Sequence, residues 1–578
     1  GIVQARISRL SKDLRELLSV ASVEGETFTS QVVARVQGLS DRQTLQLLSR
    51  DLEARHHLVR EYATSSVGPR WLSRYRFSHA LFQQYLYQSL GEGERILLHG
   101  EIAAVLEELH GDQIPEVAIL LAHHYAEAHD DEQAIEYFVL AGDVALAAYA
   151  GREAEGYYRR ALELGPPPSA EADLLANLGE ALGRQNRFRE AMDIWRDGLA
   201  RYQVLENGDA VSRLYARSAW AAIRTGDSAE GLALCLQGLG QADLALDGPG
   251  LALLLHETAE VHRDQALRTE GEPYARRALE MAERLGDVEV QAQSLTTWGI
   301  FAPSSEESLA VTTRAVDLAE KHGLLLASER AHRYLAFRLR GQGDRDAAHG
   351  HLLRSAELAG QTGLTGGQIS ALANLAISLV QAGDFGGAEE ALSQMRLLLG
   401  DLSEPTRATT LVLMAEINYL GHRGEWAACT QQAREVRASM RERGTERELA
   451  RAAIWLGWGI LEPHRLGDAV PTGEWQEAEE ALAEATQIYD RSLSPTTAIA
   501  SRLQWSTLCI LQGRLADARR LLAEANEKAS VLHSLGWTGG HLQWLEALVA
   551  TAEGDWVGAM DWFDAACKTL EDVGAHWW

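Results

Sequence analysis

A short motif that ends one helix and begins the next recurs along this chain at a nearly fixed spacing. Each copy is a glycine followed by a charged residue, and in several copies an aromatic residue comes next. In the second half of the chain the copies start at Gly343, Gly383, Gly424, Gly473, Gly513 and Gly554. The motif thus returns at an almost constant interval, with one longer interval between Gly424 and Gly473. A period of roughly 40 residues is typical of stacked helical hairpins, so we expect a repeat array and not one globular core.

The residues of one repeat explain why it would fold as a hairpin. Glycine tolerates the left-handed backbone conformation that ends a helix, and Gly226 and Asn186 mark two earlier turns of the same kind. Five residues after the glycine stands a small residue, as at Ala348, Ala388 and Ala518. A small side chain there lets two helices approach closely. Because one hairpin cannot bury its apolar stripe alone, neighbouring hairpins must stack.

Composition narrows the class of protein. Of the 578 residues 46% are hydrophobic, which excludes a disordered chain, and no run of about 20 apolar residues exists to cross a membrane. The net charge of −28 argues against a broad nucleic-acid surface. The four cysteines lie far apart in helical stretches, as expected for reduced thiols. We therefore expect a cytoplasmic protein with neither a membrane nor a nucleic-acid partner.

The first 91 residues do not follow the repeat. Apolar periodicity predicts three helices, over residues 2–21, 29–37 and 40–55. Two short extended segments follow, over 57–62 and 71–77. Three helices followed by a β-hairpin is the winged-helix plan.

Further along, Ala154, Tyr158 and Ala161 give the small–aromatic–small spacing of tetratricopeptide helices. The predicted fold class is therefore all-α: a winged-helix-like module with a small β-hairpin, followed by a tetratricopeptide-like right-handed α-superhelix. The predicted division is a winged-helix-like domain over 1–91, a connecting helix over 92–113, and a superhelix of about eleven or twelve helix pairs over 114–578.

Two motifs next to this module resemble a known family. Arg76 begins the pattern R-F-x-H-A-L, and Arg95 begins R-x-x-L-H-x-x-I-A-x-x-L-E. With the helical repeats that follow, they resemble the C-terminal part of STAND signal-transduction ATPases. The resemblance covers residues 1 to about 165 by motif and the rest by architecture only.

The resemblance implies an ATPase domain upstream. This chain has no G-x-x-x-x-G-K-[ST] motif and does not begin with Met, so we expect a fragment of a longer protein that lacks the nucleotide-binding domain. ATP or ADP would be a ligand of that longer protein, and no cofactor is expected here. His79 matches the position of a histidine that touches ADP in related winged helices. The alternative is that His79 only packs or caps a helix locally.

The resemblance also implies a role in sensing. In the family, such repeats recognise an activating molecule and release the attached ATPase to oligomerise. We expect the sensor region of a bacterial STAND protein, in a defence or conflict system. An extended inner surface suits a protein or peptide ligand, with a small molecule as the alternative.

The residues that would line this surface follow from the register of the first helix in each hairpin. Aromatic residues recur at one equivalent position, and arginines accompany them, which is the composition of binding hot spots. These candidates are Arg213, Trp220, Gln291, Trp298, Arg330, Arg333, Phe337 and Arg340. In the late repeats the candidates are Asn418, Trp455, Trp458 and Trp544. The alternative is that the aromatics pack between repeats and the arginines pair with neighbouring glutamates.

No residue pattern predicts catalysis or metal binding. His256 and His262 are six positions apart and face different sides of a helix, whereas a zinc motif needs a spacing of four. His123, His124 and His129 are also poorly spaced for a metal. We therefore predict no catalytic residue, no metal ligand and no enzymatic activity in this chain.

Two other function classes remain open. Maltose-regulator-type transcription activators also place a winged helix before helical repeats, although the third helix here carries acidic residues beside its arginines. DNA binding would weaken with salt in that case. An assembly scaffold would show no ligand-induced thermal shift.

Overall fold

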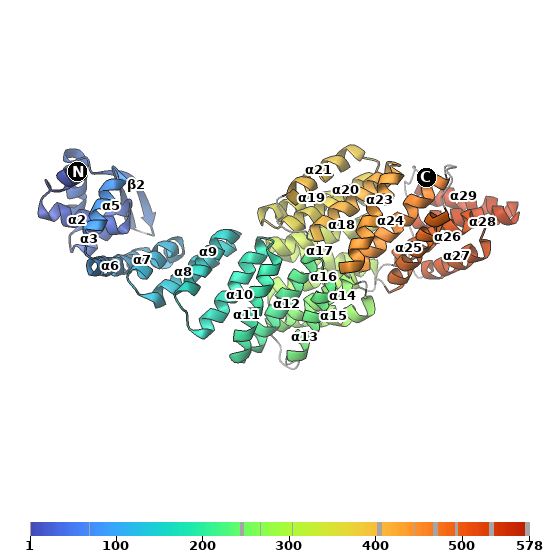
Figure 1. The fold of residues 1–578 in the computed structure, drawn as a ribbon, viewed down its shortest axis with the longest axis horizontal. Coiled ribbons are helices and arrows are strands. Elements are labelled where there is room, and N and C mark those ends of the chain that lie inside the picture. The colour runs from blue at the N-terminus through green and yellow to red at the C-terminus, as the bar shows by residue number, and fades with distance from the viewer. Residues whose placement is uncertain are drawn as a thin grey trace. The chain divides into compact units, whose positions relative to one another are not determined.

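The computed structural model of the protein describes residues 2–68, 70–242, 248–265, 267–302, 304–400, 407–443, 446–465, 472–491, 495–530 and 537–572. The chain separates into two compact units, residues 1–181 and 182–578. Figure 1 traces the elements of both in chain order. In the described part of the chain, every helix is too short or too polar to span a bilayer.

Unit 1 begins with five short helical elements. They are α1 (Ile2–Ile7), α2 (Lys12–Glu24), α3 (Ser30–Val36), α4 (Asp41–Gln46) and the π-helix η1 (Leu47–Arg55). The helix predicted over 2–21 is divided because the side chain of Ser11 accepts a hydrogen bond from the Leu14 amide and starts α2 anew. At the start of α4, Ser40 and Gln43 cap each other's backbone amides, as a capping box does.

A small antiparallel sheet packs among these helices. Its strands are β1 (Thr27–Thr29), β2 (Val59–Val67) and β3 (Arg70–Phe77), in the order β1-β3-β2. The predicted β-hairpin is confirmed, and β1 is a strand that the sequence pattern did not predict. Phe28, Tyr75 and Phe77 are buried and pack ring against ring between β1 and β3. These contacts hold the sheet together.

The rest of unit 1 is helical. Its elements are α5 (Ala80–Ser89), α6 (Glu92–His110), the 3-10 helix η2 (Gly111–Glu116), α7 (Ala118–Glu127), α8 (Asp131–Ala147), α9 (Gly151–Glu163) and most of α10 (Pro168–Arg184). The boundary between the two units falls within α10. These two compact units do not correspond to the domains predicted over 1–91, 92–113 and 114–578 and do not test their limits, which stay predictions.

Unit 2 continues with α11 (Phe188–Val204) and then, in the described part of the chain, nine consecutive helical hairpins. The first helices of the hairpins are α12 (Gly208–Thr225), α14 (Pro249–Asp264), α16 (Val288–Phe301), α18 (Leu325–Gly341), α20 (Thr365–Gln381), α22 (Arg407–His422), α24 (Glu446–Arg465), α26 (Pro495–Leu511) and α28 (Trp537–Glu553). The second helices are α13 (Ser228–Gln241), α15 (Arg268–Leu285), α17 (Ser305–Lys321), α19 (Arg345–Gln361), α21 (Phe385–Gly400), α23 (Trp426–Arg443), α25 (Thr472–Asp490), α27 (Leu515–Ala529) and α29 (Trp556–Asp572). The predicted all-α repeat fold is confirmed.

The turns between the helices have the predicted chemistry, with one correction. The glycines with positive φ include Gly226, Gly343, Gly383, Gly424, Gly513 and Gly554, and Asn186 also has a positive φ, of 61°. Gly473 was expected to be such a turn, and this prediction is wrong. It is the second residue of α25 and has no positive φ. A helix can begin with a Thr-Gly-Glu sequence, so the motif alone does not distinguish a turn from a first helical turn.

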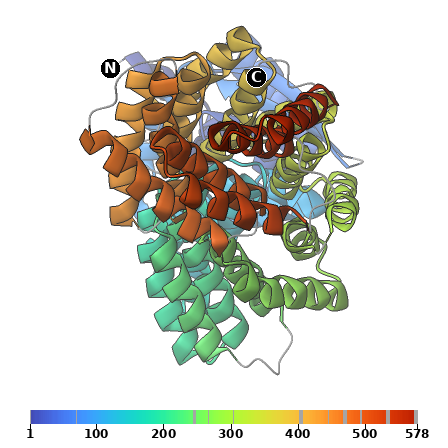
Figure 2. The ribbon, with the colours of Figure 1, turned by 90° about the vertical axis from the view of Figure 1, so that its right-hand side faces the viewer.

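The hairpins of unit 2 wind around an axis far enough to bring distant helices together. α12 contacts α22, although four other first helices lie between them in the sequence. The side-chain amide of Asn186 also reaches the Thr365 hydroxyl, with 3.5 Å between nitrogen and oxygen. Figure 2 follows this winding from the green α12 and α13, through the yellow-green hairpins, to the yellow and orange ones. The first helices therefore enclose an interior.

Candidate functional site

Helix α14 is the most deeply enclosed of the first helices. Every residue from Gly250 to Asp264 is buried, including four that are acidic or basic at neutral pH: Glu257, Glu260, Arg263 and Asp264. Burying an unpaired charge is strongly unfavourable, so these groups need partners. Other first helices supply them.

Glu260 is the first centre of this arrangement. Its carboxylate lies 2.5 Å from Arg330 of α18 and 3.1 Å from Arg263. The Thr297 hydroxyl of α16 donates a hydrogen bond to the same carboxylate at 3.0 Å. Burial alone would raise the pKa of Glu260, but the two arginines outweigh it and hold that pKa well below its usual value. Glu260 is therefore a fixed negative charge.

Asp264 is the second centre, and it links three first helices. Arg407 of α22 lies 2.7 Å from Asp264 and 3.0 Å from Glu448 of α24. The Ser228 hydroxyl donates to the other oxygen of Asp264 at 2.6 Å. The pKa of Asp264 is lowered: burial opposes ionisation, and Arg407 and Arg263 overcome that opposition. One guanidinium thus joins carboxylates from hairpins that are far apart in the sequence.

Tyr334 of α18 lies beside Arg263, which pairs with the carboxylates of both centres. The guanidinium carbons of Arg263, Arg330 and Arg333 are 5.9, 5.6 and 5.2 Å from its ring centre. Burial would raise the pKa of this phenol, and the surrounding arginines lower it overall. Arg333 also pairs with the buried Glu329 at 3.1 Å.

Buried groups beside these centres have strongly shifted pKa values. Burial raises the pKa of Glu257 to about 7 against the opposing effect of Arg330 and Arg224. Burial of His256, together with the charge of the nearby Arg330, lowers the pKa of His256 to about 3. At neutral pH the histidine is therefore uncharged, and Glu257 carries only part of a negative charge.

These groups form one electrostatic network, which we call the inner network, and positive charge dominates it. Its arginines are Arg217, Arg224, Arg263, Arg330, Arg333, Arg340, Arg407, Arg447 and Arg451. Its carboxylates are Glu257, Glu260, Asp264, Glu329 and Glu448. Among the described groups named here, nine arginines face five carboxylates, inside a chain whose net charge is −28. Such an interior favours an anionic ligand.

The predicted residues of α18 lie in two different settings. Arg330 and Arg333 are engaged in the buried ion pairs described above, as the alternative interpretation of the sequence had it. Phe337 is 45% exposed, and Arg338 and Arg340 lie 5.4 Å from its ring centre. The Nη1 atom of Arg340 is buried and has no hydrogen-bond partner among the described residues.

The other early candidates are dispersed. Trp220 packs edge-on against Phe188 and lies under the Arg224 guanidinium at 3.9 Å, which is a packing role between hairpins. Trp298 packs against a small apolar cluster around Phe301. Arg213 is exposed and pairs with Asp209 one helical turn away at 3.1 Å.

Gln291 lies near the start of α16, where its side chain is half-buried. The binding role of Gln291 and of the other early candidates stays a prediction.

The late candidates are mostly aromatic neighbours of one another. Trp455 is buried and packs against Trp458, with 4.7 Å between ring centres, and Gly421 leaves room for its ring. Asn418 is buried, and its Oδ1 atom has no hydrogen-bond partner in the described part of the chain. Trp544 is half-buried beside His541, with 5.8 Å between ring centres.

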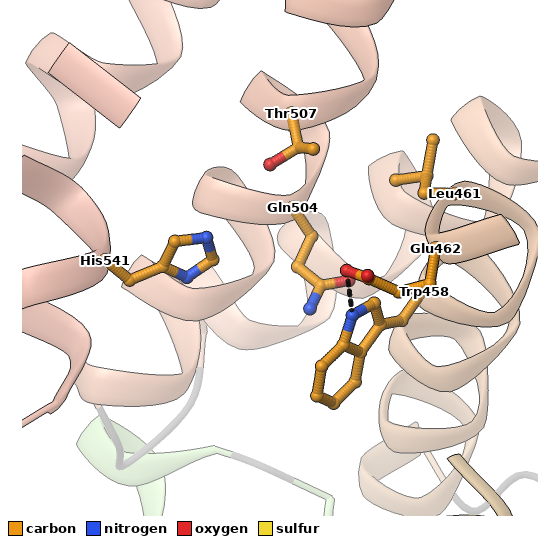
Figure 3. A pocket seen from close by; sticks show the side chains of 6 residues that line it. All are labelled: Trp458, Leu461, Glu462, Gln504, Thr507 and His541. Carbon is orange, nitrogen blue, oxygen red and sulfur yellow. Dashed lines mark hydrogen bonds between the residues drawn. The ribbon is translucent and has the colours of Figure 1, made fainter. Parts of the chain in front are cut away.

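Trp458 also lines a small pocket between three first helices. The other lining residues are Leu461, Glu462, Gln504, Thr507 and His541. Figure 3 shows these side chains converging from α24, α26 and α28, with the Trp458 indole donating to Glu462 at 2.6 Å. The cavity volume of this pocket is roughly 10 Å³, about the room that a single water molecule needs. This volume is below the usual range for a drug-sized ligand.

His79 stands outside this surface, in unit 1. Its Nδ1 atom accepts a hydrogen bond from the Leu81 amide at 3.2 Å, so it caps the start of α5. Its side chain is exposed. The predicted nucleotide contact stays a prediction.

Sequence reasoning missed the acidic half of the inner network. In the sequence, residues 256–262 raise only the question of a metal site, and within the described residues no three His, Cys, Asp or Glu side chains gather closely enough to hold a metal. A signal was present: Glu257, Glu260 and Asp264 recur at helical spacing directly after the apolar run from Leu251 to Leu255. Carboxylates on one face of a helix that begins with an apolar run can indicate charged partners elsewhere in the fold.

Comparison with known proteins places part of this chain in a repeat class. Residues 172–209 match the family model described as tetratricopeptide repeat. No curated protein matches the chain.

Solved structures with a similar fold have low sequence identity to this chain. A STAND protein with a tetratricopeptide repeat sensor from Pyrococcus horikoshii is 12% identical over 84% of this chain, with a TM-score of 0.45. This chain covers 64% of that protein, less than two thirds of its length. A Rap protein complexed with competence and sporulation factor is 13% identical, with 68% of this chain and 99% of that chain covered and a TM-score of 0.39. Yeast Tom70 is 12% identical over 77% of this chain and 96% of its own, with a TM-score of 0.33.

Proposed function

We propose that this chain is the sensor region of a bacterial STAND signal-transduction ATPase, and that the inner surface of unit 2 binds an activating protein or peptide. The observation that carries the proposal is the arginine-rich inner network, together with the exposed Phe337 at its edge. A surplus of buried positive charge in an acidic chain has an energetic cost that an anionic partner would offset.

Unit 1 fits the same proposal. The motifs that begin at Arg76 and Arg95 resemble those that follow the nucleotide-binding domain in STAND proteins. The three-stranded sheet, in the order β1-β3-β2, supports a winged-helix-like module. In the proposal, this module follows an upstream ATPase domain. In this scheme unit 2 binds the activator, and the ATPase domain responds.

The test uses the full-length protein and its activator, identified by capture from the source cell. Binding to the purified activator and activator-dependent ATP hydrolysis are both measured for Phe337→Ala. We expect activator affinity to fall about tenfold, because an aromatic residue at a binding hot spot contributes at least about 1–2 kcal/mol.

Leu397→Ala is the matched control. Leu397 is also exposed and apolar, but it lies on the second helix α21. Equal effects of the two substitutions on activator affinity, or no effect of either, would contradict binding at the inner surface.

A further inference from the structure

Three arginines of the inner network, Arg340, Arg447 and Arg451, form no ion pair with a carboxylate in the described part of the chain. Arg224 shares this property, but its guanidinium donates a hydrogen bond to the Trp220 carbonyl at 3.3 Å and packs on the Trp220 ring. The Nη1 atom of Arg340 is buried without a hydrogen bond among the described residues. The side chains of Arg340, Arg447 and Arg451 are all half-buried, so they are reachable from solvent. Elsewhere in the same interior each centre pairs arginine with Glu or Asp.

The fold brings the three arginines toward one place. Arg263 of α14 lies over Tyr334 of α18 at 5.9 Å, and Asp264 of α14 shares Arg407 with Glu448 of α24. The helices α18 and α24 therefore converge on the end of α14.

Arg447 precedes Glu448, and Arg451 lies one helical turn further along α24. Arg340 lies on α18, on the helix face that also carries Phe337.

The pKa shifts of two of these arginines agree with their positions close to other arginines. Burial of Arg340, together with the charge of the nearby Arg451, lowers the pKa of Arg340 to about 10. Burial also lowers the pKa of Arg447, and the nearby Arg263 adds to the effect. Arg340 and Arg447 thus have other guanidinium groups as neighbours, and Glu448 only partly offsets this repulsion at Arg447.

We propose that Arg340, Arg447 and Arg451 form a binding site for the carboxylate groups of an acidic peptide segment, beside the exposed ring of Phe337. The proposal rests on the proposed function and specifies the chemistry of its ligand. Guanidinium groups bind carboxylate and phosphate oxygens alike. A peptide is favoured because Phe337 offers an apolar contact next to the charges, and because carboxylates already serve as the arginine partners throughout this interior.

The test measures binding of a fluorescent hexaglutamate peptide to the intact chain at about 150 mM salt, where long-range repulsion from the acidic surface is screened. We expect binding, and we expect Arg340→Gln and Arg451→Gln each to weaken it about ten- to hundredfold. A hexaglutamine peptide and inorganic phosphate are the comparison probes, and neither is expected to compete. Competition by phosphate at a similar concentration would mean a site for a free anion and would overturn the peptide assignment.

Stability separates a binding site from a structural role. Because Arg340 has no carboxylate partner among the described residues, Arg340→Gln should leave the thermal midpoint of the ligand-free chain unchanged or raise it. Arg333→Gln, which breaks the pair with Glu329, should lower the midpoint and serves as the control. A drop for Arg340→Gln as large as that for Arg333→Gln, with unchanged peptide binding, would overturn the proposal.

The two proposals can fail separately. If the activator binds at the inner surface and Arg340→Gln does not change its affinity, only the carboxylate site is wrong. If hexaglutamate binds through these arginines and Phe337→Ala leaves the activator unaffected, the proposed function is wrong.

Discussion

Two arginines from different helices keep Glu260 ionised, and we expect the stability of unit 2 to depend on both of them. Replacing Arg330 by glutamine would leave the buried carboxylate with Arg263 as its one close cationic partner among the described residues. Because breaking a buried ion pair leaves a charge uncompensated, we expect the unfolding free energy of unit 2 to fall by about 3 kcal/mol. Urea denaturation at pH 7 measures this. Arg213→Gln, which removes an exposed pair one turn apart, should cost less than about 0.5 kcal/mol, and a similar loss for both would contradict the argument.

A pair of buried histidines in unit 1 predicts a dependence of stability on pH. The Nδ1 atoms of His99 and His124 lie 2.8 Å apart, and Tyr87 contacts the other nitrogen of His99 at 3.1 Å. Burial lowers the pKa of His99 to about 4 and that of His124 to about 3. Between those values and about 6.5 the unfolded chain binds more protons than the folded chain, so these residues make unit 1 less stable as pH falls through that range.

The test compares the wild type with His124→Leu, because another group acts in the opposite direction. Burial raises the pKa of Glu24 to about 7, so protonation of Glu24 stabilises the fold as pH falls from about 7 toward 4.5. Thermal unfolding from pH 7.5 to 5 should show a smaller acid-induced loss of stability in His124→Leu than in the wild type, by about 1 kcal/mol or more. Equal losses in the two proteins would show that His124 does not titrate as described.

At the scale of helices and turns, the sequence predicted the hairpins well but did not predict which distant hairpins contact each other. Turn glycines and small residues act within a few residues, so Gly513 and the buried Ala518 were predictable. The pairs of the inner network were not. Glu260 and Arg330 belong to different hairpins, and their contact depends on how far successive hairpins rotate. No local pattern specifies that rotation, because it accumulates from packing along the array.

A glycine with positive φ in a turn and a glycine within a helix should respond differently to substitution by alanine. Gly513 has φ of 72°, a conformation that costs a side chain roughly 1–2 kcal/mol, so Gly513→Ala should lower the unfolding free energy by about 1 kcal/mol. Gly473 lies in the first turn of α25 with open space around its Cβ position. Gly473→Ala should be neutral or stabilising by up to about 1 kcal/mol. Urea midpoints measured at constant m-value check both, and destabilisation by Gly473→Ala would restore the turn interpretation.

For unit 2 as a whole, Arg407 links first helices that are far apart in the sequence. It joins α14 to α22 and α24 through Asp264 and Glu448. In Arg407→Gln we expect hydrogen exchange in α14 to accelerate at least about tenfold, because the enclosing helices lose a shared charge partner. Exchange measured by mass spectrometry should stay unchanged in the helices of unit 1. Unchanged exchange in α14 would show that apolar packing alone closes the interior.

The contact between α12 and α22 has a consequence for how such a chain can diversify. In an open array each repeat contacts only its neighbours, so duplication or deletion of one hairpin leaves the others undisturbed. Here an added hairpin between α14 and α22 would shift every later helix around the axis and separate Asp264 from Arg407. The contact between Asp264 and Arg407 therefore requires a fixed number of hairpins between α14 and α22. We expect length variation during evolution to be confined to the stretches outside these helices.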